Sequence, residues 1–251
     1  LKYGGDYALD LDIDLPLHNS EDVAVKAGVS TSNGYVGYPD ADLSWEDISG
    51  SLTYDTSKGF SGGPLSARFL DEPVEVMFGQ ASSGNASGPD ILTIRQTGSL
   101  SVPSALRHAG LTGSEVRSGS GDGGDNYRLK GSIDYSAELD VATDTALRIT
   151  VRSSLEGLSI DWPGPFSKES EETAPLVARI DPESANGVAI TGSWEDRATF
   201  DLLLKASGVE LTFGELYLGN QTLTNIHLEA LDLGDRWVLT TNSERAVGRI
   251  V

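Results

Sequence analysis

The sequence predicts an all-β protein built mainly from antiparallel strands. Apolar and polar residues alternate along most of the 251 residues, which is the pattern of strands with one dry and one solvated face. Short turns rich in Gly, Asn, Asp and Ser separate the alternating runs, and this favours hairpins over crossover helices. Only one short stretch is compatible with a helix. A β-sandwich made from the same strands is the alternative.

The N-terminal strands have the clearest pattern. The run from Tyr7 to Leu15 places an apolar residue at every odd position and Ala or Asp between them, so one face of the strand is dry. The run from Val23 to Val29 repeats this alternation. Asn33-Gly34 then predicts a hairpin turn, because both residues tolerate a positive φ.

The middle and C-terminal parts continue the same theme. Asp71-Glu72-Pro73 is typical of a tight turn, and residues 79–90 are expected to form a loop. Pro103–Ala109 is the one predicted helix, with Ser101 or Ser104 as its cap and Gly110 as its end. Further strands are predicted at 48–54, 65–69, 74–78, 91–96, 127–135, 147–151, 200–204, 209–213, 226–228 and 237–239.

The chain is expected to be a single unit. Residues 1–251 are interpreted as one continuous β-sheet segment of a longer protein, since a strand pattern begins almost at once and no Met opens the chain. Residues 98–126 are interpreted as an insertion, made of the short helix plus a flexible Gly/Ser/Asp loop. A targeting signal or a membrane anchor would then lie outside this segment.

Composition restricts the function. The net charge is −20, from 38 acidic and 18 basic residues, and a field of this sign repels nucleic-acid phosphates. We therefore expect no nucleic-acid partner. The absence of cysteine excludes disulfides, thiolate metal sites and cysteine nucleophiles.

Two Gly-rich motifs match the letters of known sites but not their context. Gly59-Phe60-Ser61-Gly62-Gly63 fits the Gly-x-Ser-x-Gly pattern of serine hydrolases, but a strand follows it where that chemistry needs a helix. A hairpin turn is the better interpretation. Gly119-x-Gly121-x-x-Gly124 lacks the strand and helix of a dinucleotide site, so we interpret it as a solvated loop. Its Asp122, Asp125 and Asn126 lack the regular spacing of a calcium loop.

The titratable residues do not form a site either. His18, His108 and His227 are far apart and none belongs to a metal-binding pair. Asp10, Asp12 and Asp14 lie on one strand face and are interpreted as solvated. We therefore predict no catalytic residue, no metal and no cofactor.

One segment resembles a known family. Ser153–Lys168 contains a serine-led Leu155-x-Gly157-Leu158 followed by a Pro-x-Pro turn that ends at Lys168, and Ala174-Pro175-Leu176 comes next. This pattern resembles a recurring segment of the AsmA-like envelope proteins, in particular their YhdP branch, although Trp162 and Phe166 stand where leucine is usual. Looser matches extend from Ile48 to Ala67 and from Gly214 to Gly248.

The resemblance implies a fold and a function. The expected fold is a long bent sheet, like a taco open along one side, with an apolar groove. The expected function is a segment of a periplasmic lipid-transfer bridge, belonging to a protein anchored in the inner membrane, that carries phospholipid to the outer membrane. Its partners would be phospholipid acyl chains and the rest of the parent chain, and membrane contact would be made by parts outside this segment.

The resemblance implies no catalytic residues, so the candidate site is the apolar face of the strands. The predicted groove lining is Tyr7, Leu9, Leu11, Ile13, Val23, Val25, Leu52, Phe69, Val76, Ile149, Val151, Leu202, Leu204, Leu211 and Leu228. The alternative is a sandwich-like binding or adhesion module of the cell envelope, in which Trp45, Trp162, Trp194 or Trp237 would stack on sugars.

Overall fold

The computed structural model describes most of the chain. The described residues are 2–14, 24–38, 43–57, 59–81, 91–108, 128–141, 148–161, 166–182, 184–205, 208–218, 221–232, 237–242 and 247–250. Within them, eighteen strands belong to one sheet, and the one helix is α1 (Val102–His108). Val23, Trp162, His18 and the Gly-rich loop at 119–126 lie outside the described residues.

The strands follow one another along the chain with few interruptions. In order they are β1 (Lys2–Gly4), β2 (Tyr7–Asp14), β3 (Ala24–Tyr38), β4 (Leu43–Asp55), β5 (Gly59–Gly62), β6 (Leu65–Phe69), β7 (Glu72–Ala81), β8 (Ile91–Ser101), β9 (Leu129–Val141), β10 (Arg148–Ser153), β11 (Leu158–Ile160), β12 (Leu176–Asp181), β13 (Val188–Trp194), β14 (Ala198–Lys205), β15 (Gly208–Leu218), β16 (Gln221–Asp232), β17 (Trp237–Asn242) and β18 (Val247–Ile250).

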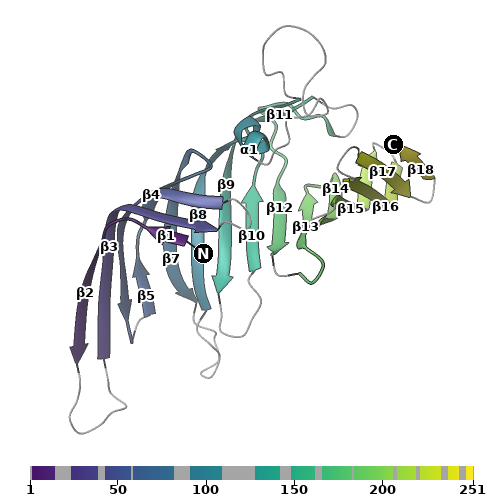
Figure 1. Ribbon diagram of the computed structural model, residues 1–251. Coiled ribbons are helices and arrows are strands. Elements are labelled where there is room, and N and C mark those ends of the chain that lie inside the picture. The colour runs from purple at the N-terminus through teal and green to yellow at the C-terminus, as the bar shows by residue number, and fades with distance from the viewer. Residues whose placement is uncertain are drawn as a thin grey trace.

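The sheet is an open antiparallel meander. All pairings between the described strands are antiparallel, and most join strands that are consecutive in sequence. Among the described residues, strand β2 pairs with β3 alone, and β18 with β17 alone. The sheet therefore has two edges and forms neither a barrel nor two packed layers. Figure 1 shows it as one long, bent sheet. The predicted all-β antiparallel sheet with one short helix is confirmed.

At three places in the sheet, two strands pair with successive parts of the same longer strand. β1 and β2 both pair with β3, β5 and β6 both pair with β4, and β10 and β11 both pair with β9. A long strand can thus bend where its partner changes. Gly131 on β9 marks one such point: its φ is +103°, and a Cβ there would lie 1.9 Å from the Gly157 carbonyl oxygen, so only glycine fits.

The structure differs from two of the predicted turns. Asn33-Gly34 is inside β3, at a register irregularity where Gly34 pairs with Ile48. The turn prediction was wrong because pairing on both sides of β3 outweighs a local turn preference. The turn predicted at 71–73 is made instead by Leu70 and Asp71, whose φ values are 51° and 66°.

The Gly-x-Ser-x-Gly motif forms a strand. Residues Gly59–Gly62 are β5, where Ser61 pairs with Thr53 and their hydroxyl oxygens lie 3.0 Å apart. The hairpin turn predicted for this motif lies just before it, at residues 56–57. Strand β6 follows, so the strand–elbow–helix arrangement of a serine nucleophile is not present at this motif.

A polar contact marks a bend in the N-terminal half. Trp45 on β4 donates its indole N–H to the Gln96 side-chain oxygen on β8 at 2.6 Å, and the Gln96 amide nitrogen donates to the Tyr135 hydroxyl on β9 at 2.5 Å. Strands β6 and β7 lie between β4 and β8, which would separate them by about 14 Å on a flat sheet. The concave side must therefore curl until Trp45 reaches Gln96. Ala67 and Val74 are buried beneath this crossing.

Burial makes Tyr135 a reporter of this bend. Desolvation raises the pKa of Tyr135, and its hydrogen bond from Gln96 opposes that change. The folded protein therefore holds this proton at pH values where the unfolded chain has lost it, so stability falls as pH rises above about 10.

We expect two of the eight tyrosines, Tyr135 and Tyr217, to ionise later than the rest in an absorbance titration at about 295 nm, and Tyr135→Phe to remove one of these two late steps. Tyr217, whose pKa is raised by the Glu215 carboxylate, remains in the variant as an internal reference. If the curves of the wild type and of Tyr135→Phe differ only by one tyrosine with an ordinary pKa, Tyr135 is not enclosed by the bend.

Candidate functional site

The register of the strands places the apolar residues on one face of the sheet. In an antiparallel pair, residues that lie directly opposite each other point to the same face. Following the partners from β7 to β16 gives an unbroken row of large apolar side chains, one per strand. Its members are Phe78, Ile94, Leu139, Ile149, Ile180, Ile190, Leu202, Leu211 and Leu228. At about 4.8 Å per strand this row extends for roughly 38 Å.

The N-terminal strands continue this apolar face. Leu9 lies opposite Val29, which lies opposite Leu52. Trp45 on β4 lies opposite Phe69 on β6, and their rings stack at 5.0 Å. The side chain of Leu65 covers Gly50 on the same side, where an added Cβ would lie 2.7 Å from the Leu65 Cδ2. The apolar face therefore extends from β2 to β16.

The opposite face, which we call the outer face, is polar. Charged and hydroxyl side chains occupy the alternate positions, with Arg95 and Glu138 paired at 2.7 Å and Thr93 donating to Asp140 at 3.0 Å. Asp10, Asp12 and Asp14 lie on this face and are exposed. Such exposed pairs contribute little stability, but they keep this side of the sheet in water.

The predicted lining residues share the apolar face. All of them except Val23, which lies outside the described residues, are placed there by the strand register. Their role in binding lipid stays a prediction. The sequence-based list omitted residues of the same row, among them Ile94, which lies in the predicted strand 91–96, and Leu139 and Ile180, which lie outside the predicted strands.

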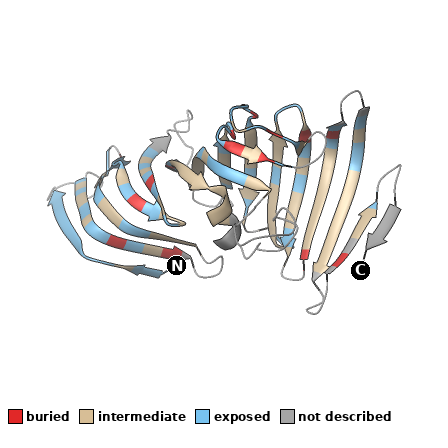
Figure 2. Cartoon of the chain, turned by 90° about the horizontal axis from the view of Figure 1, so that it is seen from above, coloured by how far each residue is buried: buried red, intermediate tan, exposed pale blue. Residues whose placement is uncertain are grey.

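Part of the apolar face is open to solvent. On β2 the relative exposures are 46% for Tyr7, 67% for Leu9, 52% for Leu11 and 48% for Ile13. In Figure 2 the strands near the N-terminus are mostly exposed, and the buried residues form short patches. A row of exposed large apolar side chains is uncommon on a soluble surface and indicates a site for an apolar ligand or partner.

One segment folds over the apolar face. We call residues 154–161 and 166–175, which lie between β10 and β12, the strap; residues 162–165 lie outside the described residues and are not part of this definition. Strand β11 of the strap pairs with β9. Leu155, Leu158 and Ile160 form a buried cluster, packed against Val102, Leu129, Ile133, Leu176 and Trp194.

Phe166 extends the strap along the apolar face toward the C-terminal strands. Its ring centroid lies 6.3 Å from that of Trp194 on β13 and 6.3 Å from that of Phe213 on β15. Aromatic pairs at this separation attract each other beyond simple burial. The strap therefore covers the ends of β12 to β15 that lie nearest to it.

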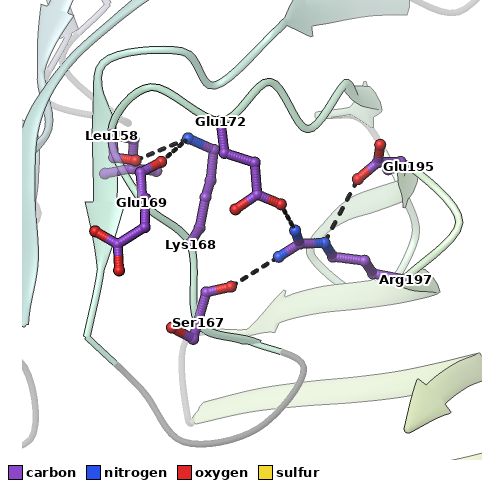
Figure 3. Close-up of polar contacts among 7 residues, drawn as sticks. All are labelled: Leu158, Ser167, Lys168, Glu169, Glu172, Glu195 and Arg197. Atoms are coloured by element: carbon purple, nitrogen blue, oxygen red, sulfur yellow. Dashed lines mark hydrogen bonds and ion pairs between the residues drawn. The ribbon is translucent and has the colours of Figure 1, made fainter. Parts of the chain in front are cut away.

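A buried lysine ties the strap together (Figure 3). Lys168 has a relative exposure of 1%, and its Nζ donates to the carbonyl oxygens of Leu158 at 2.8 Å and Glu169 at 2.9 Å. Burial lowers the pKa of Lys168, while the nearby Glu172 carboxylate acts in the opposite direction. Its carbonyl partners satisfy an ammonium group that would otherwise be costly to bury.

An arginine fastens the strap to the turn between β13 and β14. Arg197 donates to the Ser167 carbonyl oxygen at 2.9 Å and forms an ion pair with Glu172 of the strap. It also lies 3.5 Å from the Glu195 carboxylate, and its guanidinium stacks over the Trp194 ring at 5.1 Å. These contacts, drawn in Figure 3 apart from the stacked ring, join the strap to the turn between β13 and β14.

In the described part of the chain, the side chains that could ligate a metal ion are dispersed. There, no three His, Asp or Glu side chains are grouped so that they could hold a metal ion. His227 Nδ1 lies 3.0 Å from the Thr212 hydroxyl on the next strand. Across the same residues, no helix has the length and apolarity needed to cross a membrane.

The family comparison agrees with this geometry. The model of the family described as YhdP protein matches residues 1–246. The chain belongs to the YhdP family. This is a family of AsmA-like envelope proteins without enzymatic activity, so the suspected resemblance is confirmed. Neither a curated protein nor a solved structure matches the chain.

The residues that carried the YhdP resemblance build the strap. Leu155 and Leu158 enter its buried cluster, and Lys168 supplies its central hydrogen bonds. Gly157 has a φ of +90°, and a Cβ there would lie 2.3 Å from the Ser132 carbonyl oxygen. The motif therefore encodes a structural element on the apolar face. What the sequence could not show is that Phe166 and Arg197 act together with it.

We expect Lys168→Met to destabilise the protein by about 1–3 kcal/mol, because two buried carbonyl oxygens lose their donor while the aliphatic stem is kept. Lys130→Met is the matched control, since Lys130 is exposed on β9 and should change stability by less than about 0.5 kcal/mol. Chemical denaturation of both variants provides the measurement. Equal midpoints for the two would contradict the assigned role of Lys168.

Proposed function

We propose that this YhdP-family chain carries phospholipid through the periplasm as part of a bridge between the inner and outer membranes. The acyl chains would lie on the apolar face. The observation that supports this most strongly is the nine-strand row from Phe78 to Leu228, which is unbroken by any polar or small residue.

The energetics of lipid transfer suit such a surface. Exposing two acyl chains of about sixteen carbons to water costs roughly 25 kcal/mol at about 0.8 kcal/mol per CH₂. An apolar face that continues from strand to strand removes most of this barrier. It does so without tight binding, because hydrophobic contact is not directional and no polar group of the row holds the lipid at one place.

The exposed apolar side chains on β2 also support the proposal. Apolar and polar residues alternate along this strand, although Leu9 and Leu11 are more than half exposed. Unpaired apolar side chains in water give no stability, so their presence needs an occupant of the same character. Acyl chains are such an occupant, and the acidic outer face keeps the sheet soluble while they are absent.

The carbohydrate-binding alternative finds no support at the two tryptophans whose side chains the structure describes, Trp45 and Trp194. Trp45 stacks on Phe69 and donates to Gln96. Trp194 is enclosed between Phe166 and the Arg197 guanidinium. Both rings are therefore already engaged in contacts within the apolar face, whereas sugar stacking needs a free aromatic surface.

We expect Leu11→Asp to reduce the phospholipid that co-purifies with the full protein by about tenfold or more, because a carboxylate in contact with acyl chains is costly to desolvate. The fold should be kept, since Leu11 is already 52% exposed. Leu202→Asp, in the middle of the row, tests the C-terminal half in the same way. Lipid phosphorus per protein and transfer between vesicle populations are the measurements.

Ala8→Asp is the matched control for Leu11→Asp. Ala8 lies on the same strand but pairs with Ser30 on the outer face, so the added charge should leave lipid content and transfer unchanged. The proposal fails if both variants retain wild-type lipid content, or if both lose it equally while remaining folded.

A further inference from the structure

We propose that the strap orients the lipid in the C-terminal half of the sheet. The acyl chains would fill the space next to the strap, and the phosphate headgroup would follow the opposite rim. This inference rests on the proposed lipid-carrying function and adds to it the direction in which each lipid faces. The two rims are the strap rim, where strand β14 begins at Ala198, and the distal rim, where β14 ends at Lys205.

Burial changes along single strands in the way this proposal requires. On the apolar face of β14, Ala198 at the strap rim has a relative exposure of 2%, whereas Leu204 near the distal rim has 38%. On β15, Leu216 at the strap rim is also buried, with 6%. On β14, one end of the apolar face is thus closed by protein, and the other end is open to water.

The covering is fixed in place. The Gly157 N–H donates to the Ser170 carbonyl oxygen at 2.8 Å, and the Ala174 N–H donates to the Ser154 carbonyl oxygen at 2.8 Å. Ala174 has no exposed surface, and Lys168 has almost none. Lifting the strap would break the pairing of β11 with β9, the hydrogen bond from the Asp161 N–H to the Arg128 carbonyl oxygen at 2.8 Å, and the Arg197 contacts, so the strap is a fixed roof and not a gate.

The charges at the strap rim also disfavour a phosphate. The strap carries Glu156, Glu169, Glu171 and Glu172, all exposed, and Glu195 lies on the adjoining turn. The two cations held within this group are engaged: Lys168 with backbone carbonyls, and Arg197 with carboxylates and a carbonyl. An anionic headgroup placed here would meet repulsion and an apolar roof, whereas acyl chains would contact Phe166.

The orientation can be measured with spin labels, because the chain has no cysteine. Ala189→Cys and Ser193→Cys place single labels near the distal rim and the strap rim of β13. Both positions alternate with the apolar residues Ile190 and Trp194 and so lie on the outer face, away from the lipid. Four residues at about 3.3 Å each separate the two labels by roughly 13 Å.

The full protein, labelled at one position, would be loaded with phospholipid that carries a nitroxide on its headgroup or at its acyl-chain end. Distances would be taken from dipolar electron resonance. We expect the headgroup nitroxide to lie nearer to the label at 189 than to the label at 193. A headgroup nearer to 193, or equally distant from both, overturns the orientation. Lack of coupling with either lipid, at either position, contradicts the lipid-carrying function itself.

Phe166→Ala tests whether the strap causes the orientation. It removes the part of the roof over Trp194 and Phe213 and leaves the buried cluster intact, so the headgroup distances should spread toward the label at 193. Tyr217→Ala is the matched control, because Tyr217 is an aromatic residue whose neighbour Leu216 occupies the apolar face. Unchanged distances in Phe166→Ala would show that the strap does not orient the lipid.

Discussion

The architecture depends on one constraint, which is that apolar side chains keep a period of two in register across strand after strand. Side chains alternate between the faces of a strand, so a slip of one residue would move a whole apolar set to the wrong side. From β7 to β16 no such slip occurs along the row from Phe78 to Leu228. The result is a sheet with one apolar and one polar face, and no second layer that would turn the apolar face into an ordinary core.

Polar groups appear on the apolar face where the sheet needs to be held in shape. Gln96 joins Trp45 to Tyr135 across the bend, and Lys168 joins two runs of the strap. Each of these groups is buried and hydrogen-bonded. Directional bonds fix distances between segments that hydrophobic contact alone would leave free to slide. The apolar residues supply the surface, and these few polar residues supply its curvature and its covering.

The fold class and the apolar face could be predicted because both depend on local alternation, as in the run from Tyr7 to Ile13. The errors share a different cause. Asn33-Gly34 has the composition of a turn, but pairing with β1 and β4 keeps it inside a strand. Likewise, nothing in the local sequence shows that Lys168 is buried, since its partners are backbone carbonyls brought together by the strap. Contacts between distant segments decide these cases, and no periodicity reports them.

The even spacing of the nine-strand row has a consequence for movement. A chain sliding along it would meet a similar aliphatic side chain about every 4.8 Å, so its energy would vary little from one position to the next. Such a surface permits one-dimensional diffusion in either direction, because no position along it holds a chain much more tightly than the next and the energy does not fall toward either end. Any net flow along it would have to be driven from its two ends, by a difference in how readily cargo is loaded and removed.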